Sequence, residues 1–284
     1  MIVAINGNRH QENHLADIAR LVSELMRRDH KIVMTDRFLD YLEGKLGPRF
    51  PLGIVRGRLS VPPRADLAVA IGGDGAFLKT AAWVAGSETP VAGINTGHLG
   101  FLAAFSFDRP DEITRHLLDG NHTTERRSLL EVDTPAGIFH ALNEAAITRG
   151  ENASMVTIDT EINGHHSLTY KGDGLIIATP TGSTAYNLSV GGPILDPSVA
   201  GWVISPIAAH SLAIRPLVIN DSSALTATVT LRARSFLLSL DGKPVSLPDG
   251  SRLTFRKAPF TLDVVTLPGH TFTDTLRSKL GLGR

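Results

Sequence analysis

The stretch Leu67-Ala68-Val69-Ala70-Ile71-Gly72-Gly73-Asp74-Gly75 decides the fold of the first part of the chain. It begins with an unbroken apolar run, which is typical of a strand buried on both faces, and the run ends at two glycines. Residues 76–85 then have the pattern of a helix, and the apolar run 91–94 predicts another strand. A strand, a helix and a strand in succession predict a parallel sheet with helices on both faces.

The same alternation extends toward the N-terminus. Residues 2–5 and 31–34 predict strands, and the stretch between them predicts a helix. This helix has one apolar face, formed by Leu15, Ile18, Ala19, Val22, Leu25 and Met26. Residues 44–64 include four prolines and four glycines, so we expect a surface loop there. We therefore expect an N-terminal α/β domain with a Rossmann-like parallel sheet over residues 1–120.

Past residue 120 the hydrophobic pattern changes. Apolar and polar residues alternate over 156–162, 225–231 and 253–256, and Asn163-Gly164 and Asp241-Gly242 are signals for hairpin turns. This pattern predicts antiparallel strands with one buried face each. We therefore expect an all-β sandwich domain over residues 121–262. Residues 263–284 are expected to form a C-terminal tail that packs back on the N-terminal domain.

The composition excludes several classes of partner and site. The chain has 284 residues, and its 28 Lys+Arg balance 28 Asp+Glu. No overall field therefore attracts nucleic acid or an anionic membrane. Cysteine is absent, which excludes disulfides, thiolate metal sites and cysteine nucleophiles. With no leader-like start and no apolar run near the ~18 residues that span a bilayer, we expect a cytoplasmic protein.

The Gly72-Gly73-Asp74-Gly75 turn is the first segment that carries chemistry. Glycines between a strand and a helix let backbone N–H groups approach a phosphate closely. A carboxylate repels phosphate, so Asp74 is expected to accept a proton from a hydroxyl or to hold a cation. The alternative is that Asp74 caps the helix. The turn is not a Walker loop, because Leu78 precedes Lys79-Thr80, and no dinucleotide fingerprint follows the first strand.

Two further segments place polar residues beside strands. The segment from Asn95 to Leu102 predicts either a ligand-facing loop at the carboxyl edge of the sheet or an ordinary loop. The pair Asn143-Glu144 lies between apolar residues. Asn can bond the edge of an adenine, and Glu can bind a hydroxyl or an amine. The alternative is that this pair faces water at a strand end or a bulge.

The segment from Asp173 to Pro193 is the richest in polar groups. It runs from an apolar strand into a hydroxyl-rich turn, and a short helix is expected to start near Ser183 or Thr184. Hydroxyls and free N–H groups together can hold sugar or phosphate oxygens without net charge. Tyr186 could stack on a base. The alternative is a helix capped by a Ser or Thr side chain.

These four segments, in this order, strongly resemble the NAD kinase family. The resemblance continues in His210-Ser211-Leu212, in Arg215-Pro216 and in the closing segment Thr275–Gly281. Diacylglycerol and sphingosine kinases, and more distantly phosphofructokinases, share the Gly-Gly-Asp-Gly motif alone. The Thr-Gly-Ser-Thr-Ala-Tyr run together with Asn-Glu is more specific to NAD kinases. The resemblance implies an α/β domain followed by a β-sandwich that binds NAD.

The resemblance also implies the reaction and its participants. The γ-phosphoryl group of ATP would pass to the 2′-hydroxyl of the adenosine ribose of NAD, which gives NADP. A divalent cation (Mg²⁺ or Mn²⁺) and a homodimer or homotetramer are implied as well. Two alternatives are a lipid kinase of the diacylglycerol type and a non-catalytic module that binds NADP(H). The first needs a membrane-binding surface, for which we see no basic amphipathic stretch, and the second need not keep Asp74.

Single residues receive roles from the same resemblance. Asp74 is the expected proton acceptor, and Lys79 stands where the family has a basic residue near the new phosphate. Lys171 replaces an arginine of many members, which keeps the charge but loses the planar fork. Lys243 falls where some members contact the ligand of a neighbouring subunit.

No metal ligand is assigned. The expected phosphate-binding or ATP-binding residues are Gly72, Gly73, Gly75, Thr181, Gly182 and Ser183. The expected NAD- or NADP-binding residues are Asp74, Gly75, Lys79, Asn143, Glu144, Ser154, Lys171, Asp173, Thr184, Ala185, Tyr186, Asn187, Leu188, Ser189 and Lys243.

Overall fold

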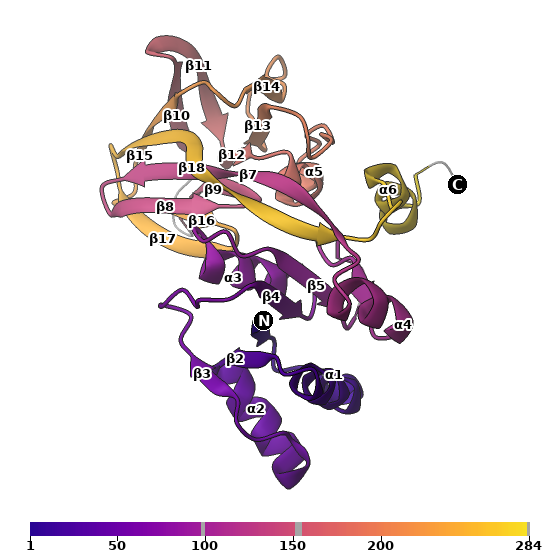
Figure 1. The fold of residues 1–284 in the computed structure, drawn as a ribbon. Coiled ribbons are helices and arrows are strands. Elements are labelled where there is room, and N and C mark those ends of the chain that lie inside the picture. The colour runs from indigo at the N-terminus through magenta and orange to yellow at the C-terminus, as the bar shows by residue number, and fades with distance from the viewer. Residues whose placement is uncertain (98–99, 151–154, 283–284) are drawn as a thin grey trace. The chain divides into compact units, whose positions relative to one another are not determined.

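The computed structural model describes residues 1–97, 100–150 and 155–282 (Figure 1). The chain divides into two compact units. We call Met1–Arg126 together with Leu262–Arg284 the α/β unit, and Arg127–Thr261 the β unit. The boundaries fall inside strands β7 (Thr123–Thr134) and β18 (Arg252–Thr266).

The α/β unit contains a parallel sheet with the strand order β3-β2-β1-β4-β5. These strands are β1 (Ile2–Gly7), β2 (Lys31–Thr35), β3 (Val55–Gly57), β4 (Leu67–Ile71) and β5 (Val91–Asn95). The short strand β6 (Phe105–Ser106) pairs with β5. The order reverses direction between β1 and β4. In open α/β sheets, ligands bind at the carboxyl ends of the strands where such a reversal occurs.

Helices cover both faces of this sheet, as the sequence predicts. One face carries Val3, Ile5, Val69 and Ile71, which share a core with α1 (Leu15–Arg27), α2 (Asp36–Leu46) and the helical turns 110–118. The opposite face carries α3 (Asp74–Val84). Strand residues alternate between the two faces. The α3 face therefore includes the small residues Ala4, Ala68, Ala70 and Gly93, and Asn6 of β1 donates from its side chain to the Thr80 hydroxyl of α3 at 3.0 Å.

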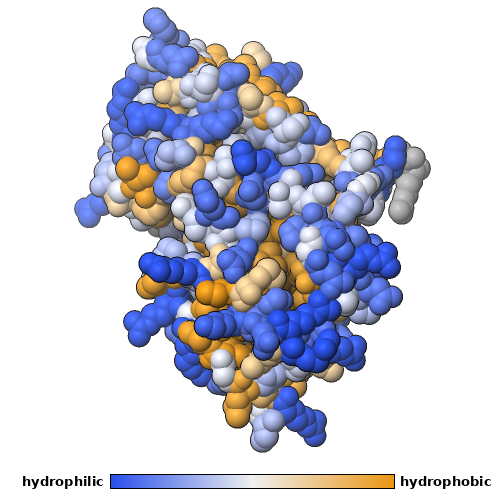
Figure 2. All heavy atoms as spheres, viewed as in Figure 1, coloured by the Kyte–Doolittle hydropathy of each residue, from blue (hydrophilic) through white to orange (hydrophobic). Residues whose placement is uncertain are grey.

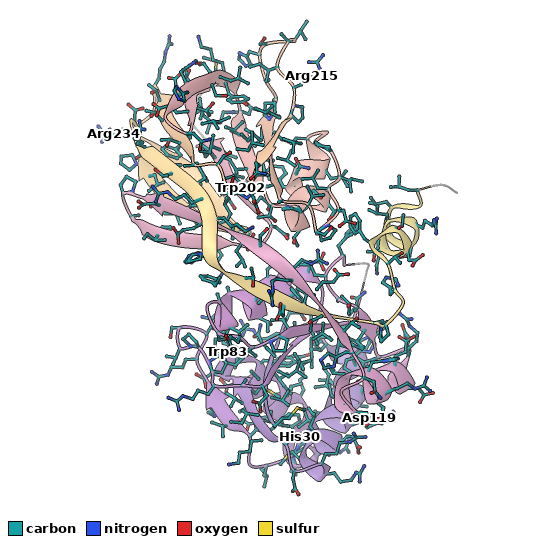
Figure 3. The ribbon with its side chains drawn as sticks, turned by 45° about the horizontal axis from the view of Figure 1, so that its top comes forward. His30, Trp83, Asp119, Trp202, Arg215 and Arg234 are labelled. Atoms are coloured by element: carbon teal, nitrogen blue, oxygen red, sulfur yellow. The ribbon has the colours of Figure 1, made fainter. Side chains whose placement is uncertain are left out.

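The β unit consists of two antiparallel sheets around a common core. The first sheet has the order β14-β13-β12-β9-β16-β17. Its strands are Leu217–Asn220, Gly201–Ile207, Gly174–Ala178, Glu144–Arg149, Ser235–Leu240 and Lys243–Pro248 in that order. The second contains β11 (His165–Gly172), β10 (Val156–Ile162), β15 (Leu225–Leu231) and β18, with the hairpin of β7 and β8 (Gly137–Ala141). Trp202, labelled in Figure 3, is fully buried in this core.

The expected fold class, an α/β domain followed by a β-sandwich, is confirmed. The strand at 67–71 and the hairpin turns at 163–164 and 241–242 lie where the sequence predicts them. The prediction of a surface loop over 44–64 is wrong for part of this range. Helix α2 continues to Leu46, and β3 adds an edge strand to the sheet. A three-residue edge strand with exposed Val55 and Arg56 leaves no hydrophobic period in the sequence.

The remaining helices are short. They are η1 (Glu12–His14), η2 (Gly47–Arg49), η4 (Thr181–Thr184), α5 (Tyr186–Ser189) and α6 (Phe272–Leu280). On the face seen in Figure 2, hydrophobic residues are interspersed among hydrophilic ones. Within the described ranges, no helix combines the length and the apolar character needed to cross a membrane.

Candidate active site

Asp74 is the first residue of α3, and the loop after β5 holds its carboxylate. The backbone N–H of Phe101 donates to Oδ2 at 2.9 Å, and that of Leu102 donates to Oδ1 at 3.1 Å. The helix N-cap is Gly73, and no side chain caps the helix there. The alternative of Asp74 as a helix cap is therefore wrong. Among the described residues each carboxylate oxygen accepts one of these hydrogen bonds, so the group is oriented and has capacity left to accept a proton.

The glycines around Asp74 fall into two kinds. Gly72 has φ of +140°, which a side chain rarely tolerates, and a Cβ at Gly100 would lie 2.9 Å from the Asp74 Cγ. The fold therefore requires these two glycines. A Cβ at Gly73 or at Gly75 would meet no atom of the described residues within 4 Å. Open space beside the N-terminus of α3 leaves its N–H groups accessible to a phosphate.

Two lysines belong to this part of the α/β unit. Lys79 is exposed and lies one helical turn after Gly75, so the two residues share a face of α3. Lys279 of α6 interacts electrostatically with Asp74. Burial lowers the pKa of Lys279, whereas the Asp74 carboxylate raises it. No local pattern in the sequence connects a C-terminal lysine with Asp74, so this neighbour was not expected.

In the β unit, Asn143 and Glu144 stand at the start of β9 and are buried, with exposures of 7% and 9%. The alternative that this pair faces water is therefore wrong. The Asp241 carboxylate accepts the backbone N–H groups of Leu142, Asn143 and Glu144 at 2.7, 2.8 and 3.2 Å. The sequence indicated Asp241 only as part of a turn, because the pattern of a turn does not say where its side chain points.

Both buried side chains keep an acceptor atom without a partner. Asn143 Oδ1 and Glu144 Oε2 make no hydrogen bond to any residue in the described ranges. Burial raises the pKa of Glu144 to about 7; the Asp241 charge adds to this rise, and the Tyr186 N–H opposes it. Buried acceptors are nearly always hydrogen-bonded in folded proteins. This pair is therefore suited to receive hydroxyl or amino groups of a ligand.

The hydroxyl-rich segment after β12 packs against the same backbone. The Thr179 N–H donates to the Asn143 carbonyl at 2.9 Å. A Cβ at Gly182 would overlap that carbonyl, so only glycine fits there. Thr181 is also buried. These contacts fix the segment beside the Asn143-Glu144 pair.

Two of the expected ligand residues serve the loop itself. The Ser183 hydroxyl donates to the Pro180 carbonyl at 2.7 Å and accepts the Leu195 N–H at 3.0 Å. The Asn187 amide donates to the Ser183 and Pro193 carbonyls at 2.9 and 3.0 Å and accepts the Ser205 hydroxyl at 2.6 Å. A ligand contact at Ser183 or Asn187 would therefore have to use the backbone. Thr184, Ala185, Tyr186, Leu188 and Ser189 are at least partly exposed.

Asp173 has a partner that the sequence analysis missed. Arg149 donates from Nε to the Asp173 carboxylate at 2.7 Å, and both side chains remain partly exposed. Lys171 and Lys243 are exposed at strand ends of the β unit. Ser154 lies outside the described residues.

The expected residues thus form two groups. Gly72, Gly73, Asp74, Gly75 and Lys79 belong to the α/β unit, and the other described ones belong to the β unit. Within the described ranges, no three His, Asp or Glu side chains gather in a way that could hold a metal ion. A resident metal cage is therefore not formed by those residues.

Comparison with known proteins identifies this arrangement. The model of the ATP-NAD kinase N-terminal domain matches residues 55–122, and that of the ATP-NAD kinase C-terminal domain matches residues 142–267. An NAD kinase of Porphyromonas gingivalis is 41% identical over 283 residues, with 99% of this chain and 98% of that protein covered. The chain belongs to the ATP-NAD kinase family. An NAD kinase of Bacteroides fragilis is 40% identical over 291 residues, with 100% and 98% covered.

Solved structures of NAD and NADH kinases share the fold. Yeast NADH kinase in complex with NADH superposes with a TM-score of 0.91 at 23% identity, with 100% of this chain and 88% of that chain covered. An NAD kinase from Archaeoglobus fulgidus in complex with ATP gives a TM-score of 0.76 at 22% identity, with 99% of each chain covered. As a member of the ATP-NAD kinase family, the chain is an enzyme that phosphorylates NAD to NADP with ATP as donor.

Proposed function

We propose that Asp74 is the general base of this reaction and that the 2′-hydroxyl of the adenosine ribose of NAD is the acceptor. The observation that carries this proposal is the oriented carboxylate of Asp74 at the N-terminus of α3, beside Gly73 and Gly75, whose Cβ positions no described residue approaches within 4 Å. A carboxylate repels phosphate, so its position beside a phosphate-binding turn is explained if it accepts the proton of the attacking hydroxyl.

The proposed step is a direct phosphoryl transfer. The 2′-hydroxyl proton passes to an Asp74 oxygen while the hydroxyl oxygen attacks the γ-phosphorus of ATP. The bond from this phosphorus to the bridging oxygen breaks, and ADP leaves. Such a transfer depends mainly on positioning and on neutralising charge. The free N–H groups of the first turn of α3 and the Lys79 ammonium group supply positive charge, and the divalent cation arrives with ATP as part of the substrate.

The residues of the β unit hold the acceptor in this proposal. Asn143 and Glu144 receive donors of the adenosine through the acceptor atoms that have no partner in the described part of the chain. Tyr186, which is 41% exposed, stacks on the base. Asp173 and the exposed parts of 184–189 bind the remainder of the dinucleotide. Phosphate oxygens are bound by the glycine-rich turn and by backbone groups of 181–183.

The proposal is tested by Asp74→Asn. Asn cannot accept the ribose proton, so kcat should fall by about 10²–10⁴-fold, while the Kd for NAD stays near that of the parent. The matched control is Asp66→Asn, because Asp66 also accepts a backbone N–H, from Ile2 at 2.7 Å. The product of the parent should carry its new phosphate on the 2′ oxygen, as read by NMR. A variant within threefold of the parent, or a 3′-phosphate, would contradict the proposal.

We also propose self-association as a homodimer or homotetramer and a cytoplasmic location. Lys243, exposed at the start of β17, supports the first because of the position it occupies in the resemblance. Light scattering on the purified enzyme tests it, and a monomer at micromolar concentration would refute it. The cysteine-free composition suits the second, which cell fractionation tests.

A further inference from the structure

We propose that Asp241 is a positioning residue that holds the Asn143–Glu144 pair in the conformation that binds NAD. This inference rests on the proposed role of that pair. Asp241 belongs to the hairpin turn between β16 and β17, about a hundred residues further along the chain. Its carboxylate contacts the backbone at the start of β9 and does not point into solvent. The turn therefore both reverses the chain and binds this strand start.

The geometry of the turn delivers the carboxylate. Asp241 and Gly242 have φ of 48° and 79°, the left-handed region that two-residue hairpin turns use. The Asp241 N–H donates to the Glu144 carbonyl at 3.1 Å. The carboxylate in turn accepts the three consecutive N–H groups of 142–144. Turn and strand start are therefore linked in both directions, and charge-assisted hydrogen bonds are about twice as strong as neutral ones.

The same segment is held from its carbonyl side. Thr179 donates its N–H to the Asn143 carbonyl, and Gly182 packs directly against this carbonyl. With donors and acceptors of the backbone both engaged, the backbone positions from which the two side chains extend are fixed. Asn143 Oδ1 and Glu144 Oε2 are buried and have no hydrogen-bond partner among the residues that the structure describes. If this backbone could shift, the two acceptor atoms could find donors within the protein. The fixed backbone instead leaves them available to a ligand.

Asp241 also sets the charge at the site. The groups that act on Glu144 are the Asp241 carboxylate and the Tyr186 N–H, and the group that acts on Asp241 from β17 is the Lys243 ammonium. Like charges raise the pKa of a carboxyl group, and this effect adds to burial at Glu144. Glu144 therefore titrates near neutral pH. Because an ionised Glu144 accepts ligand hydroxyl or amino groups, NAD affinity should rise as the pH increases through about 7.

The experiment is a titration of NAD binding against pH, by calorimetry from pH 5.5 to 8.5, on the parent and on Asp241→Asn. Asn tolerates the left-handed conformation of this position. It retains one acceptor and carries no charge. We expect the NAD Kd at pH 8 to increase about tenfold, because the pair loses its alignment. We also expect the midpoint of the pH profile to shift down by about one unit.

A matched control and a second variant separate positioning from folding. Asp249 stands in the next turn, between β17 and β18, and accepts the Leu231 N–H at 2.9 Å, so Asp249→Asn removes a comparable turn carboxylate. It should leave both the Kd and the midpoint unchanged. Asp241→Glu keeps the charge but displaces it, so it should weaken binding while the midpoint stays near that of the parent. This second variant also carries the test if Asp241→Asn does not fold.

The outcomes are distinguishable. An unchanged Kd and midpoint in Asp241→Asn, or equal losses in Asp249→Asn, would overturn the role of Asp241. The assignment of the pair to NAD is tested separately by Glu144→Gln, which should abolish the pH dependence. If Glu144→Gln binds NAD like the parent at every pH, the proposed site is wrong irrespective of Asp241.

Discussion

Gly100→Ala is expected to impair catalysis by moving one carboxylate. A Cβ at this position would lie 2.9 Å from the Asp74 Cγ and still closer to its Oδ1. Carbon atoms in contact are ordinarily about 3.5–4.0 Å apart. Either the Asp74 carboxylate or the loop at Gly100 must therefore retreat by roughly 0.6 Å or more. A flexible side chain cannot relieve this overlap, because the Asp74 side chain is short and belongs to the first turn of α3.

The displacement acts on both hydrogen bonds of Asp74. The donors are the N–H groups of Phe101 and Leu102, at 2.9 and 3.1 Å, and they directly follow Gly100. A shift of this size lengthens at least one of these bonds beyond about 3.5 Å. Misplacement by about 1 Å can cost a reaction about 10²-fold. We expect kcat to fall by about 30- to 100-fold, while the KM for NAD changes less than threefold.

The assay is steady-state kinetics with NAD and Mg–ATP, with NADP read by an NADP-specific dehydrogenase. Gly97→Ala is the matched control, because a Cβ at Gly97, which also follows β5, would meet no atom of the described residues within 4 Å. It should retain parental kcat. Thermal unfolding of both variants separates catalysis from folding. A Gly100→Ala enzyme with parental kcat, or equal losses in both variants, would refute the claim that backbone contacts at this loop position Asp74.

Further predictions concern substrate binding and stability. Glu144→Gln should raise the free energy of unfolding by up to about 3 kcal/mol at pH 8. Burial raises the pKa of Glu144 to about 7. This carboxyl group therefore contributes to the free energy of unfolding at pH values below its ordinary pKa, and that contribution is lost as the pH rises through about 7. Urea unfolding at pH 5 and pH 8 measures the difference, and a less stable variant at pH 8 would contradict it. Lys79→Ala should increase the Kd for NADP about tenfold more than that for NAD, because only the product carries the 2′-phosphate. Calorimetry with both ligands decides this, and equal losses would place Lys79 elsewhere. Gly75→Ala should raise the free energy of unfolding by about 0.5–1 kcal/mol and also raise the KM for ATP or NAD, since its Cβ fills space that the described residues leave open. Melting curves with kinetics test it, and an unchanged KM for both substrates would show that no substrate approaches this glycine.

The sequence predicts the fold well because hydrophobic period is a local signal. The run 67–71 and the alternation over 156–162 and 225–231 each determine a strand without reference to distant residues. The edge strand β3 could not be predicted in this way, since half-exposed short strands have no such hydrophobic period. The sequence analysis did not predict helix α2. One reason is that the glycines and prolines near its end and beyond it dominate the pattern of residues 44–64.

The candidate site is predictable in its residues and less so in their surroundings. Asp74 and the Asn143-Glu144 pair stand out because polar groups interrupt apolar segments. Their neighbours come from elsewhere in the chain, as Asp241 does for Glu144 and Gly100 does for Asp74. Sequence spacing carries no information on such contacts. The roles assigned to single site residues remain predictions. For Ser183 and Asn187 the predicted ligand contact is limited to backbone atoms, because their side chains bond within the loop.

The layer of small residues beneath α3 has a consequence for enzyme engineering. Ala4, Ala68 and Ala70 are fully or almost fully buried, and they have no rotamers with which to absorb a change in volume. Added methyl groups there would tilt or lift α3, and Asp74 would move with the end of the helix. A library that seeks new acceptor specificity should therefore leave this layer untouched. Variation is better placed in the exposed residues of the segment 184–189, where side chains can change without displacing the base.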